Sequence, residues 1–223
     1  EGRSLKIELF TFDLDGTLLD TAHDFLKAVN ILREKYNLEE ADFNEVRSRV
    51  SQGAGSPATY ALSAENESPD QVEIYRQELL DIYEECCLDE TRLFDGIEDV
   101  LNCLNENKIK WGIMTNKPRR FAEGIVDQKL SLFQTPFLIC PDDVNARKPD
   151  PSGLIRALEI SSVSPSESIY IGDHQIDIQA GKSAGMTTGA AGYGYVPTND
   201  HIDNWGADYN FNQPIDILKI IKS

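Results

Sequence analysis

Basic residues are scarce in this sequence. Its 21 lysines and arginines stand against 38 aspartates and glutamates, which gives a formal net charge of −17. Proteins that bind the phosphate backbone of nucleic acids or acidic lipid surfaces present basic patches to them. We therefore expect no nucleic-acid partner and no membrane partner. An acidic protein that handles phosphate must gather its positive charge locally.

Long apolar runs and metal-type cysteine spacings are also missing. No run approaches the roughly 20 residues that a membrane-spanning helix needs. The first residues show no basic segment followed by an apolar one, as a secretion signal would. The four cysteines have no metal-ligand spacing, and a chain of 223 residues is too long to depend on disulfides. We expect a cytoplasmic protein whose cysteines are reduced: Cys86, Cys87, Cys103 and Cys140.

A buried strand is predicted near the start, where an apolar run over residues 7–12 is cut off by turn residues. Asp13 and Asp15 are two positions apart, so an extended backbone projects both to one side. Gly16 then allows a sharp turn. Two carboxylates so close repel each other unless a cation or a shared proton intervenes. One aspartate alone would be explained as a cap, but Asp-x-Asp-Gly-Thr directly after a buried strand favours a functional pair.

The chain then divides into a helical stretch and an alternating one. Residues 19–91 show only helical patterns, including a helix with Ser68 as N-cap and Pro69 at its first position. From about residue 96 strands and helices alternate, which indicates a parallel α/β sheet. We therefore predict an α/β core domain from residues 1–18 and 92–223, with an inserted all-helical domain at 19–91. Within the insert, helices are expected over residues 24–36, 43–51 and 58–64, with a glycine-bearing break at 52–57.

Reactive polar residues recur where the predicted strands end. In open α/β sheets, ligands bind outside the carboxyl ends of the strands. Each residue has a structural explanation by itself: helix capping for Thr115 and Asn116, and a solvated side chain for Lys148. It is improbable that all of these separate structural explanations apply together at the same edge of the sheet. The side chains expected there are Asp13, Asp15, Thr115, Asn116, Lys148, Asp173 and Asp177, with Lys117, Arg119, Arg120 and Arg147 nearby.

These residues match, in order and type, the four motifs of the haloacid dehalogenase-like (HAD) hydrolases, which the chain resembles over about residues 7–220. The resemblance implies the HAD fold, a Rossmann-like parallel sheet flanked by helices, with the insert as a helical cap over the active site. It also implies a Mg²⁺-dependent phosphatase in which Asp13 attacks phosphorus and forms an aspartyl phosphate. Asp15 would be the general acid and base, and Thr115, Asn116 and Lys148 would hold the phosphoryl group.

The same resemblance places Mg²⁺ between the Asp13 carboxylate, the Asp15 backbone carbonyl and Asp173, with Asp177 orienting the metal shell. Charge counting shows why a cation is needed. Asp13, Asp173 and Asp177 bring three negative charges and a phosphate monoester brings two, whereas Lys148 supplies one positive charge. At about 4 Å and an effective dielectric near 20, each pair is worth roughly 4 kcal/mol. Without a cation the site would repel its own substrate.

The resemblance implies that the substrate is a small phosphorylated metabolite, and the motifs leave its identity open. The sequences Thr115-Asn116-Lys117-Pro118 and Lys148-Pro149-Asp150-Pro151 resemble the phosphoglycolate phosphatase group. More narrowly, residues 139–142, 192–195 and 204–208 look like bacterial N-acetylmuramic acid 6-phosphate phosphatases. A sugar phosphomutase shares the same motifs. A receiver-type signalling domain is a remote alternative, since such domains are about half this length. Dehalogenases lack the second aspartate, so Asp15 argues against dehalogenation.

Substrate choice is expected to fall to the insert. Its glycine-bearing break, with Gly53 and Gly55 and with Arg47 or Arg49 nearby, would let backbone approach a carboxylate or sugar hydroxyls closely. A plain turn between helices explains the same residues. His174 stands where many relatives carry a small residue, and we interpret it as an exposed residue at a helix start. The sequence does not distinguish a monomer from a homodimer.

Overall fold

The computed structural model describes residues 6–222, and its core is a six-stranded sheet in the order β5-β4-β1-β6-β7-β8. Each pair of neighbouring strands is parallel. Phe12 at the end of β1 lies in register with Ile113 of β4 and Ile171 of β6. The three central strands therefore end together, and the predicted α/β fold class is confirmed. The strands are β1 (Leu9–Phe12), β4 (Lys110–Met114), β5 (Leu138–Ile139), β6 (Ser168–Gly172), β7 (Thr187–Ala191) and β8 (Tyr209–Phe211).

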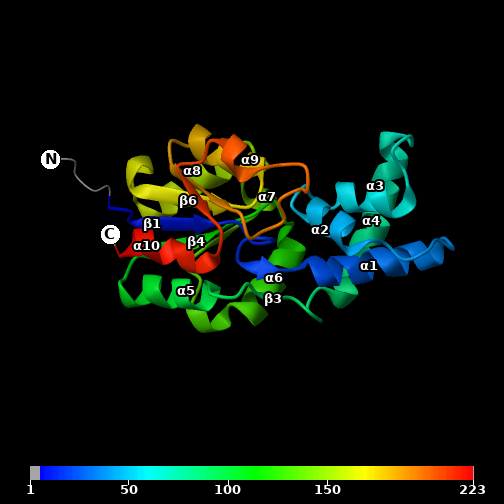
Figure 1. Cartoon of the computed structure of the whole chain (residues 1–223), viewed down its shortest axis with the longest axis horizontal. Coiled ribbons are helices and arrows are strands. Elements are labelled where there is room, and N and C mark those ends of the chain that lie inside the picture. Colours follow the sequence, from blue (N-terminus) through cyan, green and yellow to red (C-terminus); the bar gives the residue numbers. More distant parts are fainter. Residues whose placement is uncertain (1–5, 223) are drawn as a thin grey trace.

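Alternation along β1 separates the two faces of the sheet. Phe10 and Phe12 belong to a core cluster with Trp111, whereas Leu9 belongs to a second cluster with Tyr170. Both faces are covered by helices, as the burial of all four residues of β1 requires. Figure 1 shows α5 (Ile97–Glu106) and α6 (Arg119–Lys129) on one side, and α8 (Ser152–Ser161) and α9 (Gln175–Ser183) on the other. The last helix, α10 (Leu218–Ile221), lies beside α5.

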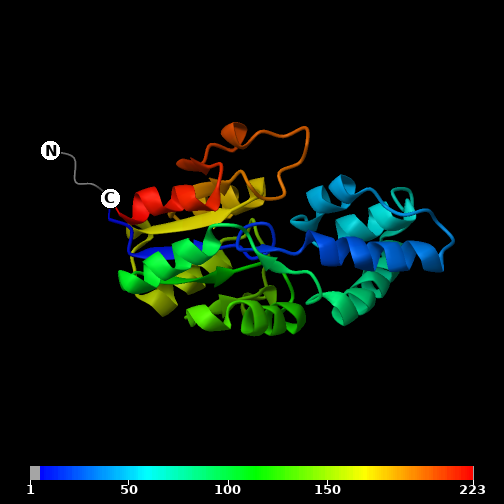
Figure 2. The same cartoon turned by 60° about the horizontal axis from the view of Figure 1, so that its bottom comes forward.

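The inserted residues form four helices that pack on one another beyond the carboxyl ends of the strands (Figure 2). Apolar side chains such as Leu32, Val46 and Leu79 are fully buried among them. The chain passes between the two parts at β2 (Leu19–Asp20) and β3 (Arg92–Leu93), which pair antiparallel. The domain boundaries at 18/19 and 91/92 remain a prediction. The helices are α1 (Ala22–Lys35), α2 (Phe43–Val50), α3 (Gly55–Leu62) and α4 (Pro69–Cys86).

Local signals placed some helix starts better than others. The Ser68 side chain accepts a 3.2 Å hydrogen bond from the backbone N–H of Gln71, so this predicted N-cap is confirmed. In contrast, α3 begins at Gly55, three residues before the predicted start at residue 58, which shortens the break and leaves Gly53 at φ +88°. Among the described residues, no helix has the length and apolar character to cross a membrane. Short helical segments complete the core: α7 (Pro141–Val144) and the 3₁₀ turns Ser131–Phe133, Pro165–Glu167, Ile202–Trp205 and Pro214–Ile217.

Candidate active site

Asp13 lies just beyond the end of β1 with one of its oxygens fixed. The Oδ1 atom accepts a 2.8 Å hydrogen bond from the backbone N–H of Leu14 and lies 2.9 Å from Lys148 Nζ. Within residues 6–222, no donor reaches Oδ2. Burial raises the pKa of Asp13 to about 7, against the lowering effect of Lys148 and assisted by the charge of Asp177. One oxygen is therefore held while the other remains available to phosphorus or to a cation.

Lys148 is held by partners from three different elements. Its ammonium lies 2.7 Å from Asp177 Oδ1 and donates to the Tyr170 hydroxyl at 3.0 Å. The Asn116 side chain bonds the Lys148 backbone twice, accepting from its N–H at 2.8 Å and donating to its carbonyl at 3.3 Å. Burial disfavours the charged amine, but Asp13 and Asp177 outweigh it and raise the pKa of Lys148 well above its usual value. The lysine is therefore a fixed positive charge beside Asp13.

Asp173 is fully buried at the end of β6 and receives only neutral donors. Its Oδ2 accepts from the backbone N–H of Tyr195 and from the Ser51 hydroxyl, both at 2.8 Å. Burial, followed by the charges of Asp13 and Asp177, raises the pKa of Asp173 well above its usual value. The backbone packs tightly around this carboxylate, because a Cβ at Gly16 would lie 2.2 Å from Asp173 Oδ2.

The carboxylates of Asp13, Asp173 and Asp177 offer oxygen atoms within 4.8 Å of one another. Asp177 already interacts with Lys148 and with the backbone N–H of His174. Asp13 and Asp173 therefore have the carboxylate oxygens that remain to bind a metal ion. Buried oxygen ligands of this kind fit a hard divalent cation such as Mg²⁺. The role of Asp177 in orienting the metal shell stays a prediction. The predicted role of the Asp15 carbonyl stays a prediction.

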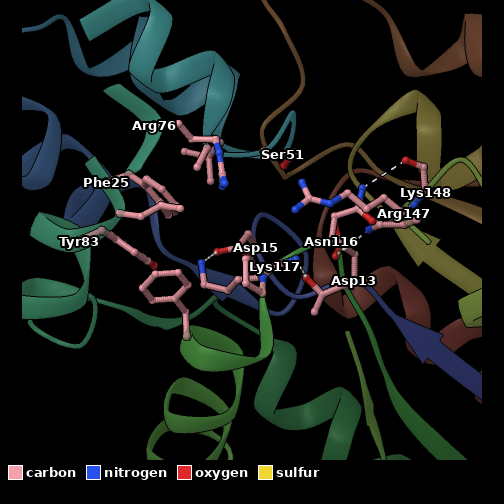
Figure 3. Close-up of a pocket in the computed structure, with 17 residues that line it drawn as sticks. Asp13, Asp15, Phe25, Ser51, Arg76, Tyr83, Asn116, Lys117, Arg147 and Lys148 are labelled. Atoms are coloured by element: carbon pink, nitrogen blue, oxygen red, sulfur yellow. Dashed lines mark hydrogen bonds and ion pairs between the residues drawn. The ribbon is translucent and has the colours of Figure 1, made fainter. Parts of the chain in front are cut away.

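Asp15 is turned towards the helical insert and pairs with a lysine. Lys117 Nζ lies 2.8 Å from Asp15 Oδ1, and the Thr21 hydroxyl donates to the same oxygen at 2.7 Å. The buried ammonium of Lys117 also lies 4.9 and 4.7 Å from the ring centroids of Phe25 and Tyr83. Figure 3 shows these two aromatic residues beside Lys117 and Asp15. The Asp15 carboxyl is thus oriented by groups from both parts of the protein.

Thr115 and Asn116 follow β4 at the same edge of the sheet. The Thr115 hydroxyl accepts from the backbone N–H of Lys117 at 3.0 Å, which leaves its own proton free to donate. The Asn116 amide oxygen and one N–H of its amide nitrogen are occupied by the Lys148 backbone. Any contact of Asn116 with a phosphoryl group would therefore come from the second N–H of the amide nitrogen or from its backbone N–H. His174 is part-buried as the N-cap of α9, rather than exposed at a helix start.

The predicted specificity residues of the insert fall in different places. Gly53 lines the cavity above Asp13, whereas Gly55 and Arg47 are not among the cavity-lining residues. Arg47 instead reaches the core, where its guanidinium donates to the Gly194 carbonyl at 2.7 Å and lies 5.0 Å from the Tyr195 ring centroid. Arg49 pairs with Glu45 on α2.

The cavity between the two parts is narrow, with a volume of about 50 Å³, and it opens to solvent. Its floor holds the acidic and basic residues described above, and one wall is apolar and aromatic. Figure 3 shows Arg76 and Arg147 reaching towards it from opposite sides. The apolar lining consists of Phe25, Val50, Ala54, Leu80, Tyr83, Pro118 and Phe121.

Sequence reasoning missed four of these groups. They are the ion pair of Lys117 with Asp15, the hydrogen bond of Ser51 to Asp173, and the positions of Arg76 and Tyr83 in the cavity wall. The first two connect residues that are 102 and 122 positions apart in the sequence. The helical spacing of residues 76, 80 and 83 was available as a signal that they share one face of α4.

Comparisons with known proteins identify the family of this chain. The family model of haloacid dehalogenase-like hydrolases matches residues 10–191. The N-acetylmuramic acid 6-phosphate phosphatase of Pseudomonas aeruginosa is 37% identical over 98% of this chain and 96% of its own. The phosphoglycolate phosphatase of Xanthomonas campestris is 36% identical over 91% of each chain. A predicted phosphoglycolate phosphatase from Haemophilus somnus has a similar structure, with a TM-score of 0.84, 25% identity, and coverage of 96% of this chain and 97% of its own.

The chain belongs to the haloacid dehalogenase-like hydrolases. The relatives that it matches along nearly its whole length are phosphatases, so the prediction of a HAD-type phosphatase, a phosphoric monoester hydrolase, is confirmed. This membership excludes the receiver-type signalling domain.

Proposed function

We propose that this protein hydrolyses a phosphate monoester through an aspartyl phosphate on Asp13. The observation that carries the proposal is the asymmetry of the Asp13 carboxylate. Lys148 and the Leu14 N–H hold Oδ1, and Oδ2 has no donor in the described part of the chain. A nucleophile needs one such oriented and unoccupied oxygen.

In the first step, Asp13 forms a bond to phosphorus and the bond from phosphorus to the alcohol oxygen breaks. Asp15 donates a proton to the departing oxygen. In the second step, Asp15 accepts a proton from water, the water oxygen attacks phosphorus, and the acyl phosphate bond to Asp13 breaks. The products are the free alcohol and inorganic phosphate. Lys148 and the Thr115 hydroxyl stabilise the phosphoryl oxygens throughout.

Mg²⁺ is the cofactor that the acidic cluster supports best. Asp13 and Asp173 would hold it, and Asp177 would keep Lys148 and the start of α9 in place around them. Bound there, Mg²⁺ would neutralise carboxylate and phosphate charge. The fully buried Asp173, with its raised pKa and neutral donors, is the residue that most needs such a cation.

For the substrate we propose N-acetylmuramic acid 6-phosphate rather than phosphoglycolate. The relative that carries this activity in its name matches 98% of the chain, compared with 91% for the phosphoglycolate phosphatase. The aromatic wall formed by Phe25, Tyr83 and Phe121 suits the carbon face of a sugar ring and an acetamide methyl. A two-carbon acid has no group to fill it.

The test compares kcat/KM for the two phosphate monoesters by release of inorganic phosphate, because this ratio measures discrimination between substrates. We expect the sugar phosphate to be preferred at least tenfold, and chelation of divalent metal to abolish turnover until Mg²⁺ is restored. The Asp13→Asn variant is the control for contaminating phosphatases. A preference for phosphoglycolate would overturn the substrate assignment. Full activity in chelator would overturn the metal assignment. The cytoplasmic location and the choice between monomer and homodimer stay predictions.

A further inference from the structure

Two arginines line the cavity but take no part in the proposed chemistry. Arg76 comes from α4 of the helical insert, and Arg147 comes from the segment that precedes Lys148. In Figure 3 the two side chains approach the cavity from different sides. The phosphoryl group already has Lys148 at the floor of the site, so these arginines are additional positive charge at the mouth.

One of the two arginines is left without an acidic partner. Arg76 is clamped by Glu73 through hydrogen bonds of 2.7 and 2.6 Å. Arg147 lines the same cavity as Arg76, and after Arg76 its charge also lowers the pKa of Glu73. Within residues 6–222 the Arg147 guanidinium itself makes no ion pair. The mouth therefore carries two positive charges against one negative charge, in a protein whose net charge is −17.

Between this mouth and the floor lies the apolar wall. Arg76, Leu80 and Tyr83 follow one another at helical spacing on a single face of α4, and all three line the cavity. The Tyr83 hydroxyl is fully buried and has no hydrogen-bond partner among the described residues. A ligand that spans the cavity thus meets basic groups at both ends and an apolar surface between them, behind which the Tyr83 hydroxyl is buried.

We propose that Arg147 and Arg76 bind a carboxylate of the substrate, with Glu73 holding Arg76 in place. The enzyme is then selective for phosphate monoesters that carry a second, carboxylic acid group. Planar guanidinium groups suit this task because they bind a carboxylate through two parallel hydrogen bonds. The inference rests on the proposed phosphatase function and names the part of the site that selects the substrate.

The experiment uses two pairs of substrates in which the members differ by the carboxylate. N-acetylmuramic acid 6-phosphate is paired with N-acetylglucosamine 6-phosphate, which lacks the lactyl acid. Phosphoglycolate is paired with ethyl phosphate. For the wild type we consider the pair that is hydrolysed faster. In that pair, kcat/KM should be roughly 10- to 100-fold higher for the member with the carboxylate, which is the range for a hydrogen bond to a charged group.

The Arg147→Gln and Arg76→Gln variants should lose most of this preference through a higher KM for the acid, while kcat/KM for the partner that lacks the carboxylate changes less than about threefold. Arg147→Lys keeps the charge and should retain part of the preference. Arg156→Gln, an exposed arginine on α8 paired with Glu159, is the matched control. Its kinetics should equal those of the wild type.

The outcomes separate this inference from the proposed substrate. Equal use of both members of each pair by the wild type, or an unchanged preference in Arg147→Gln and Arg76→Gln, would overturn the carboxylate site and leave the phosphatase intact. A carboxylate preference seen only in the phosphoglycolate pair would overturn the sugar substrate and support the arginine site.

Discussion

The Ser51 hydroxyl, at the end of α2 in the insert, donates a 2.8 Å hydrogen bond to Asp173 Oδ2 at the end of β6. The backbone N–H of Tyr195 donates to the same oxygen. Arg47 holds the carbonyl of Gly194, the residue before Tyr195. The same hydrogen-bond network therefore connects the helical insert to the core and orients Asp173, a proposed metal ligand. Binding of the cation and closure of the insert should then favour each other.

This coupling predicts that Ser51→Ala weakens Mg²⁺ binding. Asp173 loses one of its two donors to Oδ2, and a hydrogen bond to a charged group is worth about 1.5–3 kcal/mol, so we expect roughly a tenfold or larger rise in the Mg²⁺ dissociation constant by calorimetry. Ser51→Thr keeps the hydroxyl and should restore most of the affinity. Ser56→Ala removes a hydroxyl that bonds Gln52 within the insert and should change nothing. Equal affinities in Ser51→Ala and the wild type would refute the coupling.

Tyr83→Phe should separate stability from activity. The Tyr83 hydroxyl is buried without a partner in the described structure, and such a group costs about 1–3 kcal/mol. Its removal should leave the free energy of unfolding unchanged or higher in a denaturant titration. If the hydroxyl serves the substrate, kcat/KM should fall several-fold at the same time. A variant that is destabilised, with unchanged kinetics, would show a structural role only.

Lys117→Met should destabilise the protein and slow turnover. The substitution removes the ammonium that pairs with Asp15 in a buried setting, and breaking such a pair costs about 3–5 kcal/mol. Adding Asp15→Asn should recover part of the lost stability, because no charged carboxylate then remains unpaired. This recovery is measured by a double-mutant cycle of unfolding free energies. Strictly additive losses would contradict the coupling of the two residues.

The metal-free protein should lose stability as the pH rises from about 4 to about 7. Burial raises the pKa of Asp13 to about 7, above its ordinary value of 3.8, and raises that of Asp173 as well. Between the unfolded and folded pKa values the native state binds more protons than the unfolded state, so stability falls with pH until Asp13 is ionised. Thermal unfolding in chelator measures this fall. The stabilisation produced by added Mg²⁺ should grow over the same interval, and Asp13→Asn should flatten both trends.

Much of the fold, and the cluster of polar residues at the carboxyl ends of the strands, could be predicted from local patterns. Three local signals depend only on neighbours in sequence: the apolar run before Asp13, the capping residues Ser68 and Pro69, and the alternation of strands and helices after residue 96. They predicted the strands, the insert and the clustering of Asp13, Asp173, Asp177 and Lys148. The boundaries of α3 were less accurate, since a helix can begin on Gly55 when packing supplies the stability that its propensity lacks.

Contacts between the insert and the core could not be predicted in the same way. Arg47 was expected near the substrate and instead binds the Gly194 carbonyl, and Lys117 pairs with Asp15 from 102 positions away. Such contacts depend on how the helices dock on the sheet. No periodicity in either segment encodes that docking.

The most direct test of the account is to trap the phosphoenzyme. The Asp15→Asn variant, mixed with N-acetylmuramic acid 6-phosphate and Mg²⁺ and quenched in acid, should carry one phosphoryl group on the peptide that contains Asp13, as detected by mass spectrometry. The Asp13→Asn variant should carry none under the same conditions. The assignment of Asp13 as the nucleophile would be contradicted if turnover persisted in Asp13→Asn, or if a phosphoryl group appeared on a different residue.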